Sequence, residues 1–461
     1  MGLGRLALSN ILYRGANLLV SYINIILLSR LLGPRGIGET SLFIATGNLT
    51  VYILGGSLES GLIYYYTSRR IPGNRLVPLI WVMLGLQLIL LWTLMSLLHG
   101  IPGLPALIGL PGPRGSSWIV PVFVISTICT HYFSSLLSGR KAFRVLNLAI
   151  LGFNLSILVL IGVCALLRHH GAYPGNAVIL KLYLMSFGLQ GLFVAGAYLG
   201  HTGDGQWQGW HFWEDFKTLF RYARWVYLSN TLAFLALRLD FWLVGYFCGA
   251  ARLGVYSQAA RVGQLFFILP MVIAATILPF AIEQKESFVS HLVPLFKCIF
   301  WVNLLSGVFL CACSPLFFPG LFGQSFRYSA VCFIILMPGI FCYSLTNLPT
   351  AYFLGIRKLG PVLWESVICI GIILTGDLIF IPRYNILGAS LVSSAGYLIC
   401  GLYTLNVFKK TSGLKAGELI RLRKGDIHRF LEVLQSLTHP SGEHSNDPAD
   451  PSDNLRKEFT L

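Results

Sequence analysis

The chain has 461 residues, of which 55% are hydrophobic and 11% are charged, and its mean hydropathy is +0.70. Soluble domains carry about 25% charged residues, so this composition excludes an ordinary soluble enzyme or binding domain. The net charge of +16 lies mostly in loops between apolar segments. That distribution favours membrane topology and contact with lipid headgroups over nucleic-acid binding.

Apolar stretches long enough to cross a bilayer recur along almost the whole chain. They predict an all-α integral membrane protein of about twelve transmembrane helices. The first stretch is expected to be an uncleaved span, because no small-residue cleavage site follows it. We place the helices at roughly 9–30, 38–62, 76–98, 117–138, 146–167, 177–200, 222–246, 254–281, 292–315, 329–352, 361–381 and 387–408.

These helices divide the chain into an N-terminal six-helix lobe, 1–200, and a C-terminal six-helix lobe, 222–409. Residues 201–221 join the lobes and are expected to form an interfacial linker, because aromatic residues recur there at helical spacing. These are Trp207, Trp210, Trp213, Phe216 and Phe220. Residues 410–461 are expected to form a cytoplasmic tail, amphipathic and basic at first and disordered later.

The two lobes show weak similarity at nearly one spacing along the chain, which indicates an internal repeat. Gly38 and Gly254 lie in similar surroundings, and their separation, here called the repeat offset, also relates Gly139 to Gly355. A third match relates Gly175 to Gly388 at nearly the same separation. Six helices return the chain to its starting side, so the repeats are parallel and are expected to surround a central cavity.

Polar side chains form a stripe on the first predicted helix and a second stripe on the next. The first stripe consists of Arg14, Asn17, Ser21 and Asn24. Glu59, with Asn48 and Tyr52, belongs to the second. Charges inside a membrane are costly and normally face a cavity or a partner, so both readings stay open for each residue.

The matching helices of the second lobe carry Arg238 and Asp240, and then Ser257, Arg261 and Gln264. We therefore expect the polar residues of both lobes to line one wet chamber, in which cations outnumber carboxylates. Glu365 and Asp377 are separate candidates, either for a proton or ion relay or for pairing between helices.

The chain contains no motif that predicts catalysis or a resident metal. We expect no catalytic residue, no metal site and no cofactor beyond a coupling H⁺ or Na⁺. The ten cysteines lie in apolar segments and are expected to be buried apolar side chains.

Three stretches carry a recognisable pattern: LLSRLLGPRGIGETSLFIATGNLTVYILGGSLESGLIYY (27–65), RLDFWLVGYFCGAARLGVYSQAARVGQLFFILP (238–270) and IPRYNILGASLVSSAGY (381–397). They resemble the polysaccharide biosynthesis flippases of the O-antigen type, within the multidrug, oligosaccharidyl-lipid and polysaccharide exporter superfamily. The resemblance spans nearly the whole membrane region and rests on diffuse patterns of Gly, Arg and Asp.

The resemblance implies a flippase that moves undecaprenyl-pyrophosphate-linked oligosaccharide from the cytoplasmic to the outer leaflet by alternating access, for O-antigen or lipopolysaccharide export. Its substrate-binding residues would be Arg14, Asn17, Ser21, Asn24, Arg238, Arg261 and Gln264, and its ion-coupling candidates Glu59 and Asp240. Its partners would be the lipid-linked oligosaccharide, membrane lipids, a polysaccharide polymerase and glycosyltransferases.

The implied location is the bacterial cytoplasmic (inner) membrane. Both termini are expected on the cytoplasmic side, because the loops on that side would hold roughly twice as many lysines and arginines as the opposite loops. Three alternatives stay open: a cation-coupled multidrug exporter, a flippase for peptidoglycan precursor, and a membrane scaffold that transports nothing.

Overall fold

The structure, a computed structural model, describes residues 3–101, 118–170, 175–202, 212–274, 288–356, 358, 360–414, 416–421 and 425–426. Within these ranges it contains helices and turns and no strand. The helices are α1 (Leu3–Gly55), α2 (Leu58–Thr67), α3 (Gly73–His99), α5 (Ile119–Gly139), α6 (Phe143–His169), α7 (Asn176–Thr202), α8 (Phe212–Gly263), α10 (Phe288–Phe322), α11 (Arg327–Ser344), α12 (Asn347–Gly355), α13 (Gly360–Ser412) and α14 (Ala416–Ile420). Short 3₁₀ turns, η1 (Gln264–Phe267) and η2 (Gln324–Phe326), follow α8 and α10.

Three of these helices reverse direction. α1, α8 and α13 have 53, 52 and 53 residues, whereas one crossing needs about 20. Each contains one non-helical residue with positive φ: Gly33 at 68°, Gly249 at 78° and Asn385 at 54°. Glycine and asparagine tolerate this backbone, and Pro34 further disfavours helix at Gly33.

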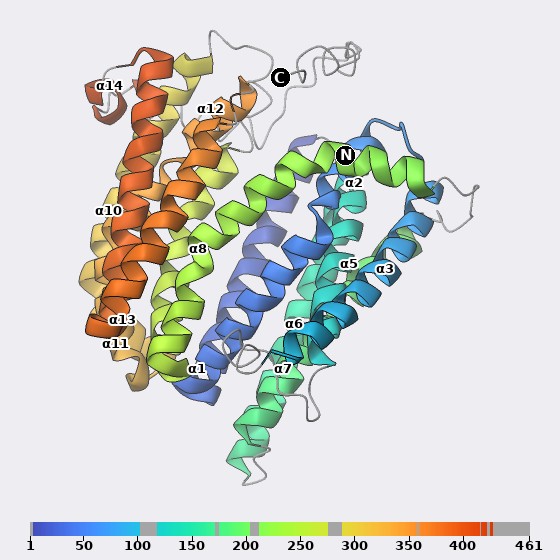
Figure 1. The fold of residues 1–461 in the computed structure, drawn as a ribbon, viewed down its shortest axis with the longest axis horizontal. Coiled ribbons are helices and arrows are strands. Elements are labelled where there is room, and N and C mark those ends of the chain that lie inside the picture. Colours follow the sequence, from blue (N-terminus) through green and yellow to red (C-terminus); the bar gives the residue numbers. More distant parts are fainter. Residues whose placement is uncertain are drawn as a thin grey trace.

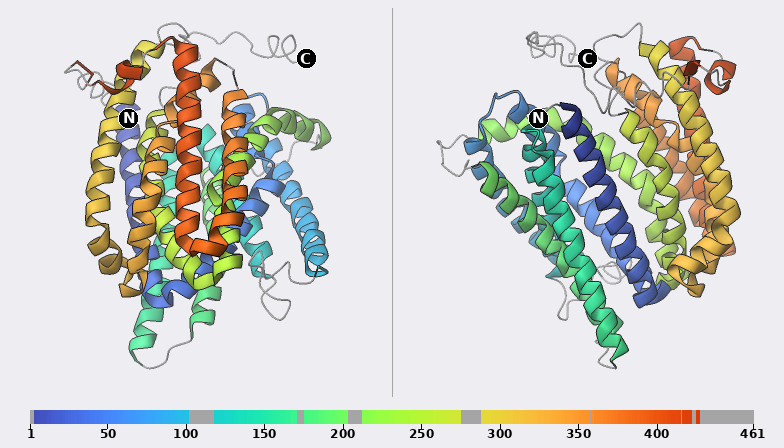
Figure 2. Two further views of the ribbon diagram at one scale, coloured as in Figure 1. Left: turned by 60° about the vertical axis from the view of Figure 1, so that its left-hand side comes forward. Right: turned by 180° about the vertical axis from the view of Figure 1, so that it is seen from behind.

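Each long helix turns back at that residue and makes two passes (Figures 1 and 2). Nine helical segments in the described ranges are long and apolar enough to span a membrane, and three of them contain such a reversal. The predicted all-α membrane fold of about twelve spans is therefore confirmed.

The helices form two bundles, with α1 packed on α5, α6 and α7, and α8 packed on α11 and α13. α1 and α8 make the main contact between the bundles. The bundles converge at the end where Gly33 and Gly249 lie, here called the reversal end (Figure 2). They diverge toward the opposite end, here called the α14 end, where α1 begins and α14 lies (Figures 1 and 2).

The linker joins both bundles. Residues 203–211, with Trp207 and Trp210, lie outside the described residues, and from Phe212 the chain runs as helix into the first pass of α8. Its first turns are fixed to the N-terminal bundle by a two-pronged ion pair between Arg75 and Asp215, with the shortest N–O distance 2.8 Å. Tyr222 also stacks on Tyr64 with ring centroids 4.7 Å apart.

The helix predicted at 38–62 is interrupted. Gly56 and Ser57 adopt positive φ angles of 57° and 49°, so α1 ends at Gly55 and α2 begins at Leu58. Asn230 of α8 donates to the Ser57 hydroxyl at 3.2 Å, across the boundary between the lobes.

The beginning of the predicted tail packs on the C-terminal bundle. Leu419 of α14 is buried in an apolar cluster with side chains of α10, α12 and α13. Asp426 forms a buried ion pair with Lys297 of α10 at 3.0 Å. The remainder of the tail, from residue 427, lies outside the described residues.

Candidate functional site between the two lobes

The lobes touch closely at the reversal end, around two glycines of the repeat. A Cβ on Gly38 would lie 1.7 Å from the carbonyl oxygen of Ala250, and a Cβ on Gly254 would lie 1.9 Å from that of Pro34. The repeat offset relates both pairs, because it separates Pro34 from Ala250 as it separates the glycines. The contact is therefore symmetric about an axis between the repeats, and any side chain at either glycine would force it apart.

Hydrogen bonds reinforce this closure. Ser41 donates to Ser257 at 3.0 Å, and these residues are also related by the repeat offset. Gln258 donates to the Ser29 hydroxyl at 2.6 Å. Arg30 caps the carboxyl end of α10 by donating to the carbonyl oxygen of Leu321 at 2.8 Å, with a second bond to that of Gly320.

Two arginines lie further from the reversals, on the two passes of α8. Arg238 donates to the side chain of Gln264 at 2.7 Å and lies 4.7 Å from the ring centroid of Phe241. Arg261 reaches across to the N-terminal lobe, where its guanidinium lies 3.5 Å from the Ser41 hydroxyl. The Tyr22 hydroxyl of α1 donates to the Arg261 carbonyl at 3.4 Å.

Both guanidiniums are half-buried and close enough to interact electrostatically. Within the described part of the chain, neither forms an ion pair with a carboxylate. Arg238 and Asp240 are two positions apart on a helix and form no ion pair, but their charges attract each other electrostatically. A pair of partly desolvated guanidiniums of this kind favours an anionic ligand, and phosphate oxygens match their donor geometry.

The predicted stripe of α1 divides between two directions. Asn17 and Asn24 are buried against α6, where they donate to the carbonyls of Asn147 at 3.2 Å and Asn154 at 2.9 Å. Ser21 is half-buried. The Arg14 side chain lies outside the described residues, so its placement stays a prediction. Asn17 and Asn24 thus connect helices within one lobe.

Asp240 and Asp377 form a second polar cluster, inside the C-terminal lobe. Both are buried, at 1% and 0% exposure, and they interact electrostatically. Asp240 accepts hydrogen bonds from Tyr256 and, at 3.3 Å, from Ser393. The Oδ1 of Asp240 and both carboxylate oxygens of Asp377 are buried without a hydrogen-bond partner among the described residues.

A charged buried carboxylate that lacks donors, as Asp377 does, is costly, so the pair favours a bound proton or cation. Asp240 has two hydroxyl donors and also interacts electrostatically with Arg238. Oxygen ligands of this kind suit a hard cation such as Na⁺. Asp240 was predicted as a coupling residue and Asp377 as a relay candidate, and the fold brings the two together. The described residues contain no group of three or more His, Cys, Asp or Glu side chains that could hold a metal ion.

Glu59 and Glu365 lie apart from this cluster. Glu59 is half-buried in the first turn of α2, beside Tyr52, His131 and Tyr132. Glu365 is buried, and its Oε2 accepts a hydrogen bond from Thr404 at 2.8 Å within the C-terminal lobe.

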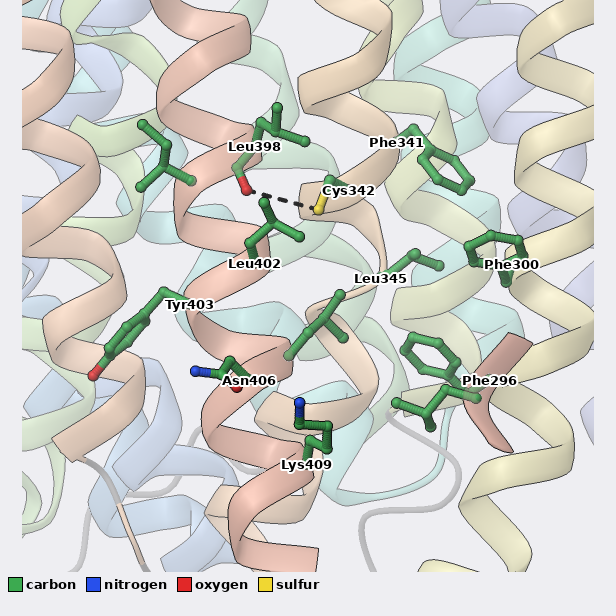
Figure 3. A pocket seen from close by; sticks show the side chains of 13 residues that line it. Phe296, Phe300, Phe341, Cys342, Leu345, Leu398, Leu402, Tyr403, Asn406 and Lys409 are labelled. Atoms are coloured by element: carbon green, nitrogen blue, oxygen red, sulfur yellow. Dashed lines mark hydrogen bonds between the residues drawn. The ribbon is translucent and has the colours of Figure 1, made fainter. Parts of the chain in front are cut away.

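A large apolar cavity of about 740 Å³ lies between α10, α11 and α13 of the same lobe (Figure 3). Phe296, Phe300 and Phe341 line one side, and Tyr403, Asn406 and Lys409 supply polar groups (Figure 3). The two arginines of α8 are not among its lining residues. This cavity is suited to an acyl or prenyl chain more than to a sugar.

Several residues at these sites were not predicted from the sequence: Tyr22 and Ser41 near the arginines, and Tyr256 and Ser393 beside Asp240. The repeat offset could have found Ser41, because it matches Ser257. Hydroxyl residues are common in helices, and nothing in the local sequence distinguishes the others.

Comparisons with known proteins found a family-model match and similar solved structures. Residues 208–330 match the model of a family described as polysaccharide biosynthesis protein. No curated protein sequence matches the chain significantly. Among solved structures, the chain is similar to Lipid II flippase MurJ in an inward closed conformation, with 15% identity, a TM-score of 0.68, and coverage of 95% of this chain and 94% of that one.

It is also similar to a multidrug resistance MATE family transporter in an inward-facing conformation, at 14% identity and a TM-score of 0.63, with coverage of 88% and 98%. A transporter of the same superfamily from Pyrococcus furiosus, described as having a binding pocket of reverse polarity, gives 15% identity, a TM-score of 0.57, and coverage of 89% and 95%. These likenesses show that the chain has the fold of the transporters of this superfamily.

Proposed function

We propose that this chain is a flippase for undecaprenyl-pyrophosphate-linked oligosaccharide. It is a multi-pass membrane protein with the fold of the multidrug, oligosaccharidyl-lipid and polysaccharide exporter superfamily, and part of it matches the polysaccharide biosynthesis family model. The supporting observation is the arginine pair, Arg238 and Arg261, at the boundary of the lobes. Two guanidiniums without a paired carboxylate suit the diphosphate of such a substrate.

In the proposed cycle the α14 end faces the cytoplasm, in keeping with the distribution of Lys and Arg. The lobes diverge at that end and meet at the reversal end, so the substrate enters from the cytoplasmic leaflet. The diphosphate binds Arg238 and Arg261, and the lobes then rock about the substrate. Separation of the Gly38 and Gly254 contact releases it on the outer side. The TM-scores of 0.63 to an inward-facing MATE transporter and 0.54 to an outward-facing one support the inward assignment.

Asp240 and Asp377 are the proposed site of a coupling H⁺ or Na⁺. Three of their oxygens are buried without a hydrogen-bond donor, and a cation bound between them would compensate the cost of burying these oxygens. Because both helices belong to the C-terminal lobe, binding would change how α8 packs on α13, and α8 also carries the arginines. That shared helix links the cation to the substrate.

The function is tested by replacing Arg238 or Arg261 with Gln and measuring surface polysaccharide in cells that depend on this chain. Each loses charged hydrogen bonds worth about 1.5–3 kcal/mol, so export should fall roughly ten- to a hundredfold while the protein stays inserted. Lys at either position keeps the charge without the planar fork and should retain part of the activity.

Arg35→Gln is the matched control, because Arg35 is exposed and pairs with Glu39 one turn away. Normal polysaccharide from both Gln variants would refute the proposed anion site.

A multidrug exporter is less consistent with the arginine pair, because cationic drugs would be repelled by the arginines. A peptidoglycan-precursor flippase shares the diphosphate chemistry. Transport of Lipid II compared with the undecaprenyl-linked oligosaccharide in proteoliposomes separates those two.

A further inference from the structure

A polar cavity of about 710 Å³ lies in the N-terminal lobe at the α14 end, where α2 passes to α3 and α5 passes to α6. Arg69, Arg140 and Lys141 line it together with Tyr66, Thr67 and Gly73. None of its lining residues carries a carboxylate. The cavity therefore concentrates positive charge at a membrane boundary, separately from the arginine pair of α8.

Two of the three cations stand where glycine would be expected. α2 and α5 end in the same motif: Arg69 N–H bonds to the Tyr66 carbonyl and Arg70 N–H to Tyr65, while Lys141 N–H bonds to Ser138 and Ala142 N–H to Leu137. In this motif the left-handed residue is usually glycine. Here it is Arg69 at φ 54° and Lys141 at φ 58°.

A side chain in this conformation is strained, and such strain persists at sites where it serves a purpose. The two turns also meet, because a Cβ on Gly139 would lie 2.8 Å from the Tyr66 ring and 3.1 Å from the Thr67 hydroxyl. The sequence thus places a cation at two costly positions, and the fold directs both to one cavity.

The third cation is held in place by aromatic rings. Arg140 donates to the Tyr66 hydroxyl, and its guanidinium lies 5.5 Å from the Tyr66 ring centroid and 5.9 Å from that of Tyr198. The two tyrosine hydroxyls are 3.3 Å apart. Attraction between the guanidinium and the rings fixes a positive charge at the cavity wall.

One carboxylate beside the start of α3 is already engaged. Asp215 forms its two-pronged ion pair with Arg75, in the first turn of α3. Neither Arg69 nor Lys141 forms an ion pair within the described residues. The first turn of α3 contains no acidic residue, and Pro72 before it provides no side-chain cap. All these features favour a negative ligand.

We propose that this cavity binds the phosphate of an anionic lipid headgroup. Its volume lies in the range of small-molecule sites and exceeds the needs of a lone ion. Its place at the ends of spanning helices puts it at headgroup depth, where basic pockets bind anionic lipids. The phosphate comes from a membrane phospholipid or from a prenyl-diphosphate carrier. The proposed binding of either lipid does not depend on whether the chain transports oligosaccharide.

The test uses the full chain purified in detergent and measures its melting temperature with three probes: short-chain phosphatidylglycerol, farnesyl diphosphate and short-chain phosphatidylcholine. We expect one or both of the anionic probes to stabilise the protein and the zwitterionic one not to. Arg69→Gln with Lys141→Gln should weaken that binding by about tenfold or more through loss of charged hydrogen bonds. Lys217→Gln with Lys358→Gln removes two exposed cations elsewhere at the same end and should leave binding unchanged.

Arg69→Gly with Lys141→Gly distinguishes loss of ligand binding from misfolding. Glycine relieves the left-handed backbone, so this variant should melt no lower than the wild type without ligand and should lose the response to anionic probes. Stabilisation by phosphatidylglycerol alone identifies a phospholipid site, and stabilisation by farnesyl diphosphate identifies a carrier site. The proposal is overturned if no anionic probe stabilises the wild type, or if the variants and the control respond equally.

Discussion

Asn24 on α1 and Asp240 on α8 occupy equivalent positions, because the offset that relates Gly38 to Gly254 also relates these two residues. Asn24 supplies its own donor and bonds to the Asn154 carbonyl at 2.9 Å. Asp240 has no side-chain N–H and depends on donors from Tyr256 and Ser393. Each leaves one oxygen without a hydrogen-bond partner among the described residues, but only the carboxylate can carry a charge, which interacts electrostatically with Arg238. The repeat has kept the position and changed its chemistry.

Tyr22 and Arg238, at the lobe boundary, are also related by the repeat offset, and they too differ in charge. The N-terminal lobe presents a neutral hydroxyl, which bonds to the Arg261 carbonyl, and the C-terminal lobe presents a guanidinium. Duplication therefore explains the symmetric closure at the reversal end. Divergence has placed the Arg238 and Arg261 charges and the Asp240 cluster in one lobe, so that lobe carries both proposed binding events.

Removal of both buried carboxylates should have the largest effect. Asp240→Asn with Asp377→Asn removes both buried carboxylates of this cluster, so stimulation of transport by an imposed Na⁺ or pH gradient should vanish. Labelled undecaprenyl-linked oligosaccharide in proteoliposomes measures this. Asn24→Ala at the matched position should retain the stimulation. A double variant that responds to gradients like the wild type would exclude this cluster as the coupling site.

The symmetric closure is tested by Gly38→Val. The new side chain would meet the Ala250 carbonyl, and overpacking of this kind costs about 1–3 kcal/mol, so the closed state should be depleted roughly tenfold. Disulfide formation between Ser41→Cys and Ser257→Cys reports closure, because the two hydroxyls are 3.0 Å apart. Linked peptides are quantified by mass spectrometry.

Gly371→Val is the control for that experiment, because a Cβ there meets nothing within 4 Å. The disulfide yield should match that of the parent. Equal yields in the Gly38 and Gly371 variants would mean that the tight contact does not limit closure.

Asn24→Asp copies the C-terminal chemistry into the N-terminal lobe and should be destabilising. The carboxylate would face the Asn154 carbonyl without a donor, at a cost of about 1–3 kcal/mol. Melting temperature in detergent should fall more than for Asn24→Ala, which loses one hydrogen bond. If Asn24→Asp melts like the wild type, the N-terminal lobe accommodates a buried carboxylate at this position as the C-terminal lobe does, and the proposed difference between the lobes is wrong.

The sequence alone was sufficient for the fold because apolar length and repeat spacing are strong signals. Gly33, Gly249 and Asn385 fall in the loops expected between predicted spans, and the match between Gly38 and Gly254 identified residues that meet in space. The break at Gly56 and Ser57 was not predicted as a helix end. Short interruptions of this kind are set by tertiary contacts, here the bond from Asn230 to Ser57.

The site was harder to predict, because helical periodicity gives a face and does not say what the face meets. Asn17 and Asn24 share a stripe with Ser21, yet they bond to α6. Asp240 and Asp377 lie on different helices, far apart along the chain, and no local pattern relates them. Arg69 and Lys141 appeared as ordinary loop cations, and only the positive φ angles single them out.

The smallest effect is expected at Arg30, which breaks the symmetry of the closure. Arg30 bonds to the end of α10, and the repeat offset pairs Arg30 with Tyr246, so the equivalent position of the other lobe does not carry a cation. A cation at a helix carboxyl end contributes about 0.3–1 kcal/mol, and Arg30→Gln should therefore lower the Ser41–Ser257 disulfide yield by roughly two- to fivefold. Salt should reduce the wild-type yield toward that of the variant, because an exposed charge is screened. If the yield is unchanged, the glycine contact alone holds the reversal end closed.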